Sequence, residues 1–129
     1  MTKFVVDASV WIEYLQDTEK GRQAAKAIES EESDCFTPAS VVAEVTSKAI
    51  RSGNLNIGLA FEAFTSLSTV SELTREMAAM AGHIHSEIKK KNKDFGMLDA
   101  FVVATARKLG AKILTCDSDF KGFKETIMI

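Results

Sequence analysis

The sequence is poor in cysteine and has no long hydrophobic run. It contains two cysteines, Cys35 and Cys116, too far apart to form a CxxC pair. Two reduced, partly buried thiols are the expected state, with a disulfide or a thiol role as the alternative. No apolar stretch approaches the roughly 18 residues of a membrane span, and the N-terminal apolar run, which ends at Asp7, lacks the form of a signal peptide. We therefore expect a cytoplasmic protein with no membrane partner.

An excess of positive charge is also missing. The formal net charge is −2 and the isoelectric point is about 5.7. This balance argues against a protein that holds nucleic acid by a general basic surface. A nuclease stays open, because an acidic site can reach phosphate through bound cations, helped by local basic residues.

What is present is the composition of one soluble globular domain. The chain has 129 residues, of which 46% are hydrophobic and 26% charged. That length is enough for a single core, so residues 1–129 are predicted to form one domain.

Strand and helix signals alternate from end to end. Thr37-Pro38 has the form of a helix N-cap followed by proline at the first helical position, and Gly53 and Gly110 are predicted to end helices. The stripe of Leu73, Met77, Met80, Ile84 and Ile88 is typical of an amphipathic helix. Strands are predicted at 3–7, 34–36, 69–72, 112–115 and 126–129, and helices at 8–16, 19–31, 38–52, 55–68, 73–88 and 97–109.

This alternation predicts a three-layer α/β/α fold with a mostly parallel central sheet. Because crossovers between parallel strands are right-handed, the carboxyl ends of the strands share one edge of the sheet. Ligand sites in such folds lie at that edge.

Several acids are predicted to fall at this edge. Asp7 ends the first strand, Asp117 follows the strand at 112–115, and Asp99 lies in the first turn of a helix. Glu44 lies two turns into its helix and reaches the edge only if that helix leans across it.

Each acid has a simpler explanation when taken alone. Asp7 could cap the helix that follows it. Asp99 could complement a helix dipole, and Glu44 could pair with Lys48 one turn later. The acids of 117–119 could be ordinary turn residues.

Taken together, the acids favour a metal site. Four carboxylates within about 5 Å of one another would repel by roughly 3 kcal/mol per pair at an effective dielectric of 20. Without a cation some of them would have to bind protons. A hard divalent cation removes the repulsion, and oxygen-only ligands indicate Mg²⁺ or Mn²⁺.

The chain resembles PIN-domain ribonucleases, in particular VapC-type toxins of toxin–antitoxin pairs. The resemblance covers essentially the whole chain, and its motifs occur in the expected order. The matching segments are VVDASVWIEYL (5–15), PASVVAEV (38–45), LDAFVVATA (98–106) and TCDSDF (115–120).

The resemblance implies a metal-dependent endoribonuclease that hydrolyses RNA phosphodiester bonds. It also implies a homodimer and a small antitoxin protein that lies over helices near the active cleft. The acidic quartet that it implies as catalytic and metal-binding is Asp7, Glu44, Asp99 and Asp117. Residues implied to lie beside this quartet are Ser9, Thr115 and Asp119, the last being a more variable acid.

Other readings are less consistent with the sequence. A HAD-type phosphatase needs a second acid two residues after the first, where Ser9 stands here. A receiver domain needs paired acids after its first strand, and Asp7 is single. A non-catalytic RNA-binding protein would typically have lost part of the quartet. A housekeeping PIN-domain nuclease for RNA processing or quality control shares the chemistry and remains the main alternative to a toxin.

Two further features carry weaker signals. His83 and His85 are two apart, so a helix would point them to different sides and a shared metal site is not expected. The run KKKNK (89–93) is predicted to be a solvated helix end, with phosphate contact as the alternative.

Overall fold

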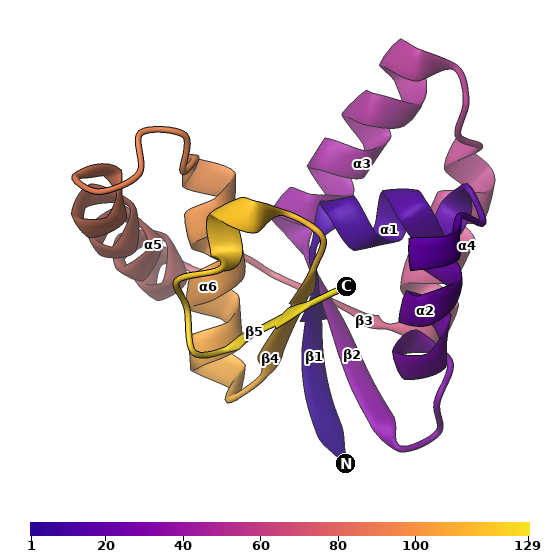
Figure 1. Cartoon of the computed structure of the whole chain (residues 1–129), viewed down its shortest axis with the longest axis horizontal. Helices are drawn as coiled ribbons and strands as arrows, with labels where there is room; N and C mark the ends of the chain where they lie inside the picture. Colours follow the sequence, from indigo (N-terminus) through magenta and orange to yellow (C-terminus); the bar gives the residue numbers. More distant parts are fainter.

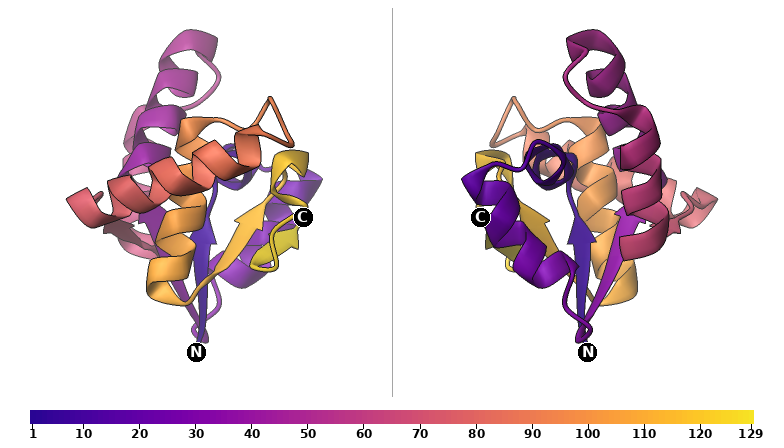
Figure 2. Two further views of the ribbon diagram at one scale, coloured as in Figure 1. Left: turned by 90° about the vertical axis from the view of Figure 1, so that its left-hand side faces the viewer. Right: turned by 90° about the vertical axis from the view of Figure 1, so that its right-hand side faces the viewer.

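A computed structural model describes all 129 residues as one α/β domain. Five parallel strands form one sheet in the order β3-β2-β1-β4-β5. Figure 1 shows α5 and α6 on one side of this sheet and α1 and α2 on the other, and Figure 2 shows the same layers from both sides. The strands are β1 (Thr2–Val6), β2 (Ser33–Pro38), β3 (Thr69–Ser71), β4 (Lys112–Thr115) and β5 (Thr126–Met128). The helices are α1 (Ala8–Leu15), α2 (Glu19–Ile28), α3 (Ala39–Ser52), α4 (Ile57–Leu67), α5 (Arg75–Lys89), α6 (Met97–Leu109) and the short 3₁₀ turn η1 (Ser118–Phe120). The three-layer fold predicted from the sequence is confirmed.

Local chemistry explains where the helices begin and end. Thr18, Asn56 and Thr74 cap α2, α4 and α5 by accepting hydrogen bonds from backbone N–H groups of the first turn. Gly53 and Gly110 end α3 and α6 with φ of 68° and 64°, the left-handed conformation that glycine adopts at least cost.

One predicted boundary is wrong. Thr37 does not cap α3, because β2 continues through Thr37 and Pro38, which pair with β3. The Thr37 hydroxyl is engaged instead by the indole of Trp11, at 3.1 Å, and by Ser68, at 2.7 Å. Helix α3 therefore starts one residue late, with Pro38 at its N-cap.

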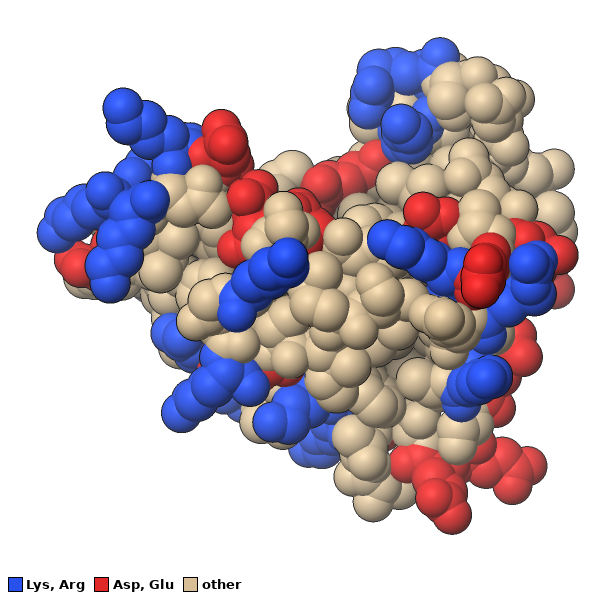
Figure 3. Space-filling model, viewed as in Figure 1, with Lys and Arg blue, Asp and Glu red and all other residues tan.

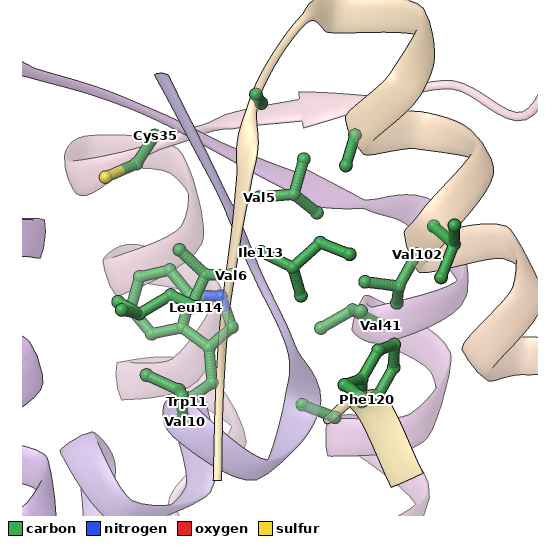
Figure 4. Packing of buried hydrophobic residues seen from close by; sticks show 14 of the residues in the cluster. Val5, Val6, Val10, Trp11, Cys35, Val41, Val102, Ile113, Leu114 and Phe120 are labelled. Atoms are coloured by element: carbon green, nitrogen blue, oxygen red, sulfur yellow. The ribbon is translucent and has the colours of Figure 1, made fainter. Parts of the chain in front are cut away.

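The core is divided by the sheet. Figure 4 shows Val6 and Leu114 on the side of Trp11, whereas Val5 and Ile113 point toward Val102 of α6. This is the alternation expected of strands buried on both faces. Because β1 and β4 are held from both sides, their carboxyl ends form a rigid platform for the residues that follow.

None of the helices combines the length and the apolar character needed to cross a membrane. The two cysteines are separate free thiols, Cys35 buried and Cys116 partly exposed.

Candidate metal centre

Asp7 lies at the carboxyl end of β1, beside the end of β4. Its backbone N–H donates to the carbonyl of Leu114 at 3.0 Å, which fixes the residue between the two strands. Its side chain is buried, and Oδ2 accepts hydrogen bonds from Ser9 at 2.8 Å and Thr115 at 2.9 Å. Although Asp7 occupies the N-cap position of α1, its side chain makes no capping hydrogen bond. The simple capping explanation therefore does not account for this acid.

The two hydroxyls that serve Asp7 also connect it to the segment after β4. Their oxygens lie 3.3 Å apart. Ser9 Oγ accepts from the Cys116 N–H and Thr115 Oγ1 accepts from the Asp117 N–H, each at 3.0 Å. Burial raises the pKa of Asp7, and the hydrogen bonds from Ser9 and Thr115 act in the opposite direction. The hydroxyls thus oppose the effect of burial on this carboxylate, although the pKa stays raised.

Asp99, Asp117 and Asp119 form the tightest acidic group in the protein. One carboxylate oxygen from each lies within 4.8 Å of the others, a spacing that suits a single cation. Asp99 Oδ2 accepts from the N–H of Gly96 at 2.8 Å, which anchors it at the start of α6. Asp117 Oδ1 accepts from the N–H of Asp119 at 2.9 Å. Asp99 therefore does serve its helix start, as the simple explanation has it, and lies in the acidic group as well.

Asn92 is a member of the site that the sequence analysis missed. Its Nδ2 donates to Asp119 Oδ1 at 3.0 Å, and its own Oδ1 accepts from the Asp94 N–H. The contact ties the loop between α5 and α6 to η1, across 27 residues of sequence. Nothing local in the KKKNK run distinguishes this asparagine, so only the folded structure reveals the contact.

Glu44 reaches the site from α3. Its pKa is raised to about 7, first by burial and then by the charges of Asp7, Asp99 and Asp117. The suggested partner Lys48 is not used, since the ion pairs of the structure join other residues. Instead, Glu44 Oε1 is buried without any hydrogen-bond partner. A buried carboxylate oxygen with no donor is costly unless something else binds it.

The pKa of Asp99 is raised as well. Burial raises its pKa to about 6, the hydrogen bond from Gly96 opposes this shift, and the charges of Asp7, Asp117 and Asp119 add to it. The acids named from the sequence thus interact with one another through their charges, but the group within single-ion distance holds only Asp99, Asp117 and Asp119, and not Asp7 or Glu44.

The donor set fits a hard divalent cation. All the candidate ligands are carboxylate oxygens, which Mg²⁺, Mn²⁺ and Ca²⁺ prefer. A cation bound among these carboxylates could give the unpaired oxygen of Glu44 a partner, and it would offset the mutual repulsion that adds to the effect of burial on the pKa values of Glu44 and Asp99.

The histidines stand apart from each other. His83 lines a separate cleft with Arg107 and Phe123, whereas the half-buried ring of His85 stacks on Phe95 at 6.5 Å. That cleft contains none of the acids described above.

Comparison with known proteins gives one family. The sequence model of the PIN domain matches residues 4–125. Comparison with curated protein sequences gives no match.

Several solved structures with a similar fold come from toxin–antitoxin systems. A toxin–antitoxin complex from Klebsiella pneumoniae has a TM-score of 0.75 at 18% identity, over 96% of this chain and 95% of that one. VapC20 of Mycobacterium tuberculosis, described as a sarcin–ricin loop cleaving toxin, has a TM-score of 0.70 at 19% identity, over 92% and 93%. DNA-bound VapBC of Salmonella typhimurium has a TM-score of 0.71 at 19% identity, over 100% and 98%. At such identities the likeness establishes a shared fold.

Proposed function

The chain belongs to the PIN-domain family, and on that premise we propose that it is a metal-dependent endoribonuclease and the toxin of a VapBC-type pair. The observation that carries the proposal is the convergence of the carboxylates at one edge of the sheet, with the buried oxygen of Glu44 left without a donor. A purely structural cluster of acids would leave no such oxygen unpaired, and a bound metal ion would supply the missing partner.

The quartet of Asp7, Glu44, Asp99 and Asp117 would hold Mg²⁺ or Mn²⁺. Asp119 lies close enough to Asp99 and Asp117 to complete the shell or to hold a water beside it. Ser9 and Thr115 donate to Asp7, which orients its carboxylate and favours its charged form. When bound, such an ion activates water and offsets charge on a scissile phosphate. Serine and threonine here have no neighbouring base, so a covalent route is not proposed.

The RNA substrate and the antitoxin partner are supported by the relatives. VapC20 is described as cleaving the sarcin–ricin loop, and several similar structures are toxin–antitoxin complexes. In this chain, Ile50 of α3 and Leu59 and Phe61 of α4 are exposed apolar side chains. They suit burial under an antitoxin segment or in a homodimer.

Expression in a bacterial host tests the proposal. We expect growth arrest, relieved by Asp7→Asn and by co-expression of a small antitoxin encoded beside the gene. Purified protein should cleave single-stranded RNA with Mg²⁺ and lose that activity in EDTA. Cleavage without growth arrest would indicate a housekeeping nuclease, whereas RNA binding with no cleavage under any divalent ion would indicate a non-catalytic protein.

A further inference from the structure

Two clefts lie on either side of the acidic site. The first has a volume of about 320 Å³ and is referred to below as the Arg51 cleft. It is lined by Ala43, Glu44, Ser47, Arg51 and Leu98. Glu44 belongs to the acidic site, so this cleft opens directly from it on the side of α3.

The second cleft has a volume of about 370 Å³ and is referred to below as the Lys91 cleft. It shares Asp119 with the acidic site, on the side of the loop between α5 and α6. Its lining residues are Ile88, Lys91, Asn92, Ser118, Asp119, Gly122 and Phe123.

The two clefts share three kinds of lining residue. Each joins one acid of the site to one cation, Glu44 with Arg51 and Asp119 with Lys91, and each adds an apolar side chain, Leu98 or Phe123. Neither cation forms an ion pair with the acid of its cleft. A cation and an apolar surface next to a metal site match the phosphate and the sugar–base part of a nucleotide.

The surface agrees with this arrangement. Figure 3 shows acidic side chains in a hollow at the carboxyl edge of the sheet, with basic side chains on raised parts of the molecule to either side. In the same view of Figure 1, the raised parts are the far end of α3 and the end of α5 with the loop that follows it. Positive charge is therefore present at both flanks of the site, as well as elsewhere on this face, on a protein whose net charge is −2.

Arg51 is held in place for such a contact. Its Nε donates to Ser47 Oγ at 3.2 Å, one turn earlier on α3. This leaves the two terminal nitrogens of the guanidinium without a protein partner, and they form the planar fork that binds phosphate by two hydrogen bonds.

We propose that a single RNA strand crosses the site from the Arg51 cleft to the Lys91 cleft. The phosphate to be cleaved lies at the carboxylates, and the phosphates before and after it contact Arg51 and Lys91. Leu98 and Phe123 contact the adjoining sugars or bases. This assignment rests on the proposed nuclease function and specifies which residues bind its substrate.

Binding of a fluorescent 12-nucleotide single-stranded RNA tests the assignment. Asp99→Asn protein in Mg²⁺ serves as the background, so that the RNA remains intact. Arg51→Ala and Lys91→Ala are each expected to weaken binding about fivefold. Each should also reduce the slope of log K against log salt by about 0.7, the value for one phosphate contact on a single strand. Arg51→Lys should keep the slope but bind more weakly than Arg51, because its ammonium lacks the fork.

Lys108→Ala is the matched control. Lys108 is exposed in the last turn of α6, nine residues and therefore about 13 Å along the helix from Asp99, and lines neither cleft. The Lys108→Ala variant loses the same single positive charge as the other two variants, so it measures the effect of net charge alone on RNA binding. Equal slopes for Arg51→Ala, Lys91→Ala and Lys108→Ala would overturn the assignment.

Cleavage by proteins with an intact Asp99 separates this inference from the proposed function. Normal kcat/KM for Arg51→Ala and Lys91→Ala, with an active wild type, would reject the two clefts and leave the nuclease standing. No cleavage by the wild type, together with the expected slopes, would reject the nuclease and keep the clefts as an RNA-binding surface.

Discussion

Asp7 and Glu44 belong to the same site, yet one is surrounded by hydroxyl donors and the other has a buried oxygen with no partner. Asp7 follows a central strand, and Ser9 and Thr115 stabilise its charge from within the fold. Glu44 comes from α3, where burial first and then the charges of other acids disfavour its charged form, and its buried oxygen has no donor. The difference teaches that the strand side of the site is satisfied within the folded chain, whereas the α3 side has an unpaired oxygen that the proposed cation would bind.

The largest expected effect is a loss of RNA cleavage, which tests whether the strand side and the α3 side of the site act in the same reaction. Asp99→Asn should reduce RNA cleavage at least about 100-fold, because it removes a negative ligand from between the two sides. The fold should persist, since an amide oxygen can still accept the Gly96 N–H. Cleavage rates in Mg²⁺ together with circular dichroism check this. A folded Asp99→Asn protein with full activity would show that Asp99 is not a metal ligand.

The strand side should lose stability when a donor is removed. Thr115→Val keeps the shape but deprives Asp7 of one hydroxyl and the Asp117 N–H of its acceptor. The expected cost is about 1–3 kcal/mol in the free energy of unfolding, measured by urea denaturation. Thr65→Val is the control, because that exposed hydroxyl bonds only to carbonyls of its own helix, α4. Equal, small effects would mean that Asp7 does not need its donors.

On the α3 side, a substitution that removes charge should increase stability instead of lowering it. Glu44→Gln is expected to stabilise the metal-free protein at pH 8 by about 1–2 kcal/mol, less than the full pKa shift implies because Glu44 is partly solvated. It should also weaken Mg²⁺ binding. Melting temperatures in EDTA, with exposed Glu62→Gln as control, measure the first effect. Destabilisation by Glu44→Gln would contradict the comparison.

The raised pKa values of Glu44 and Asp99 predict how the stability of the metal-free protein depends on pH. The pKa of Glu44 rises from 4.5 to about 7 on folding and that of Asp99 from 3.8 to about 6. The folded state therefore binds protons more tightly than the unfolded chain. Stability of the metal-free protein should be highest below about pH 4 with respect to these two groups and fall as the pH rises to about 7. Saturating Mg²⁺ should flatten this slope; an unchanged slope would argue against a shared metal site.

The smallest expected effect concerns Asn92. Asn92→Ala removes the donor that orients Asp119, so Mn²⁺ affinity should fall about threefold. The effect is small because the contact is only partly buried. Titration calorimetry of metal-free protein measures it, with Asn54→Ala in an exposed loop as control. A fall with both variants would trace the effect to general loop disturbance.

Much of the fold follows from local pattern. The apolar runs at 3–7 and 112–115 predicted the two central strands, and the left-handed glycines at 53 and 110 ended helices as expected. Thr37 was misassigned because its hydroxyl is satisfied by Trp11 and Ser68, residues that no local window connects to it. The stripe that predicted α5 began at Leu73, but Thr74 caps the helix, so Leu73 precedes it.

The placement of the acids could be predicted only in part. The positions of Asp7 and Asp117 follow from strand ends in a parallel sheet, and Glu44 was expected only if α3 leans across the edge. The close approach of Asp119 to Asp99 and the bond from Asn92 depend on how η1 meets the loop after α5. Such loop-to-loop geometry is set by packing of the whole domain, which the residue pattern does not encode locally.

The hydrogen bond between Thr115 and Asp7 joins residues 108 positions apart. During synthesis, β1 leaves the ribosome long before β4, since translation adds about 5–20 residues per second. For several seconds the nascent chain therefore carries Asp7 and Ser9 without the second donor, Thr115, and without Asp117. A protein that cuts RNA by this site would be harmless to the ribosome that makes it until the fourth strand has emerged and docked.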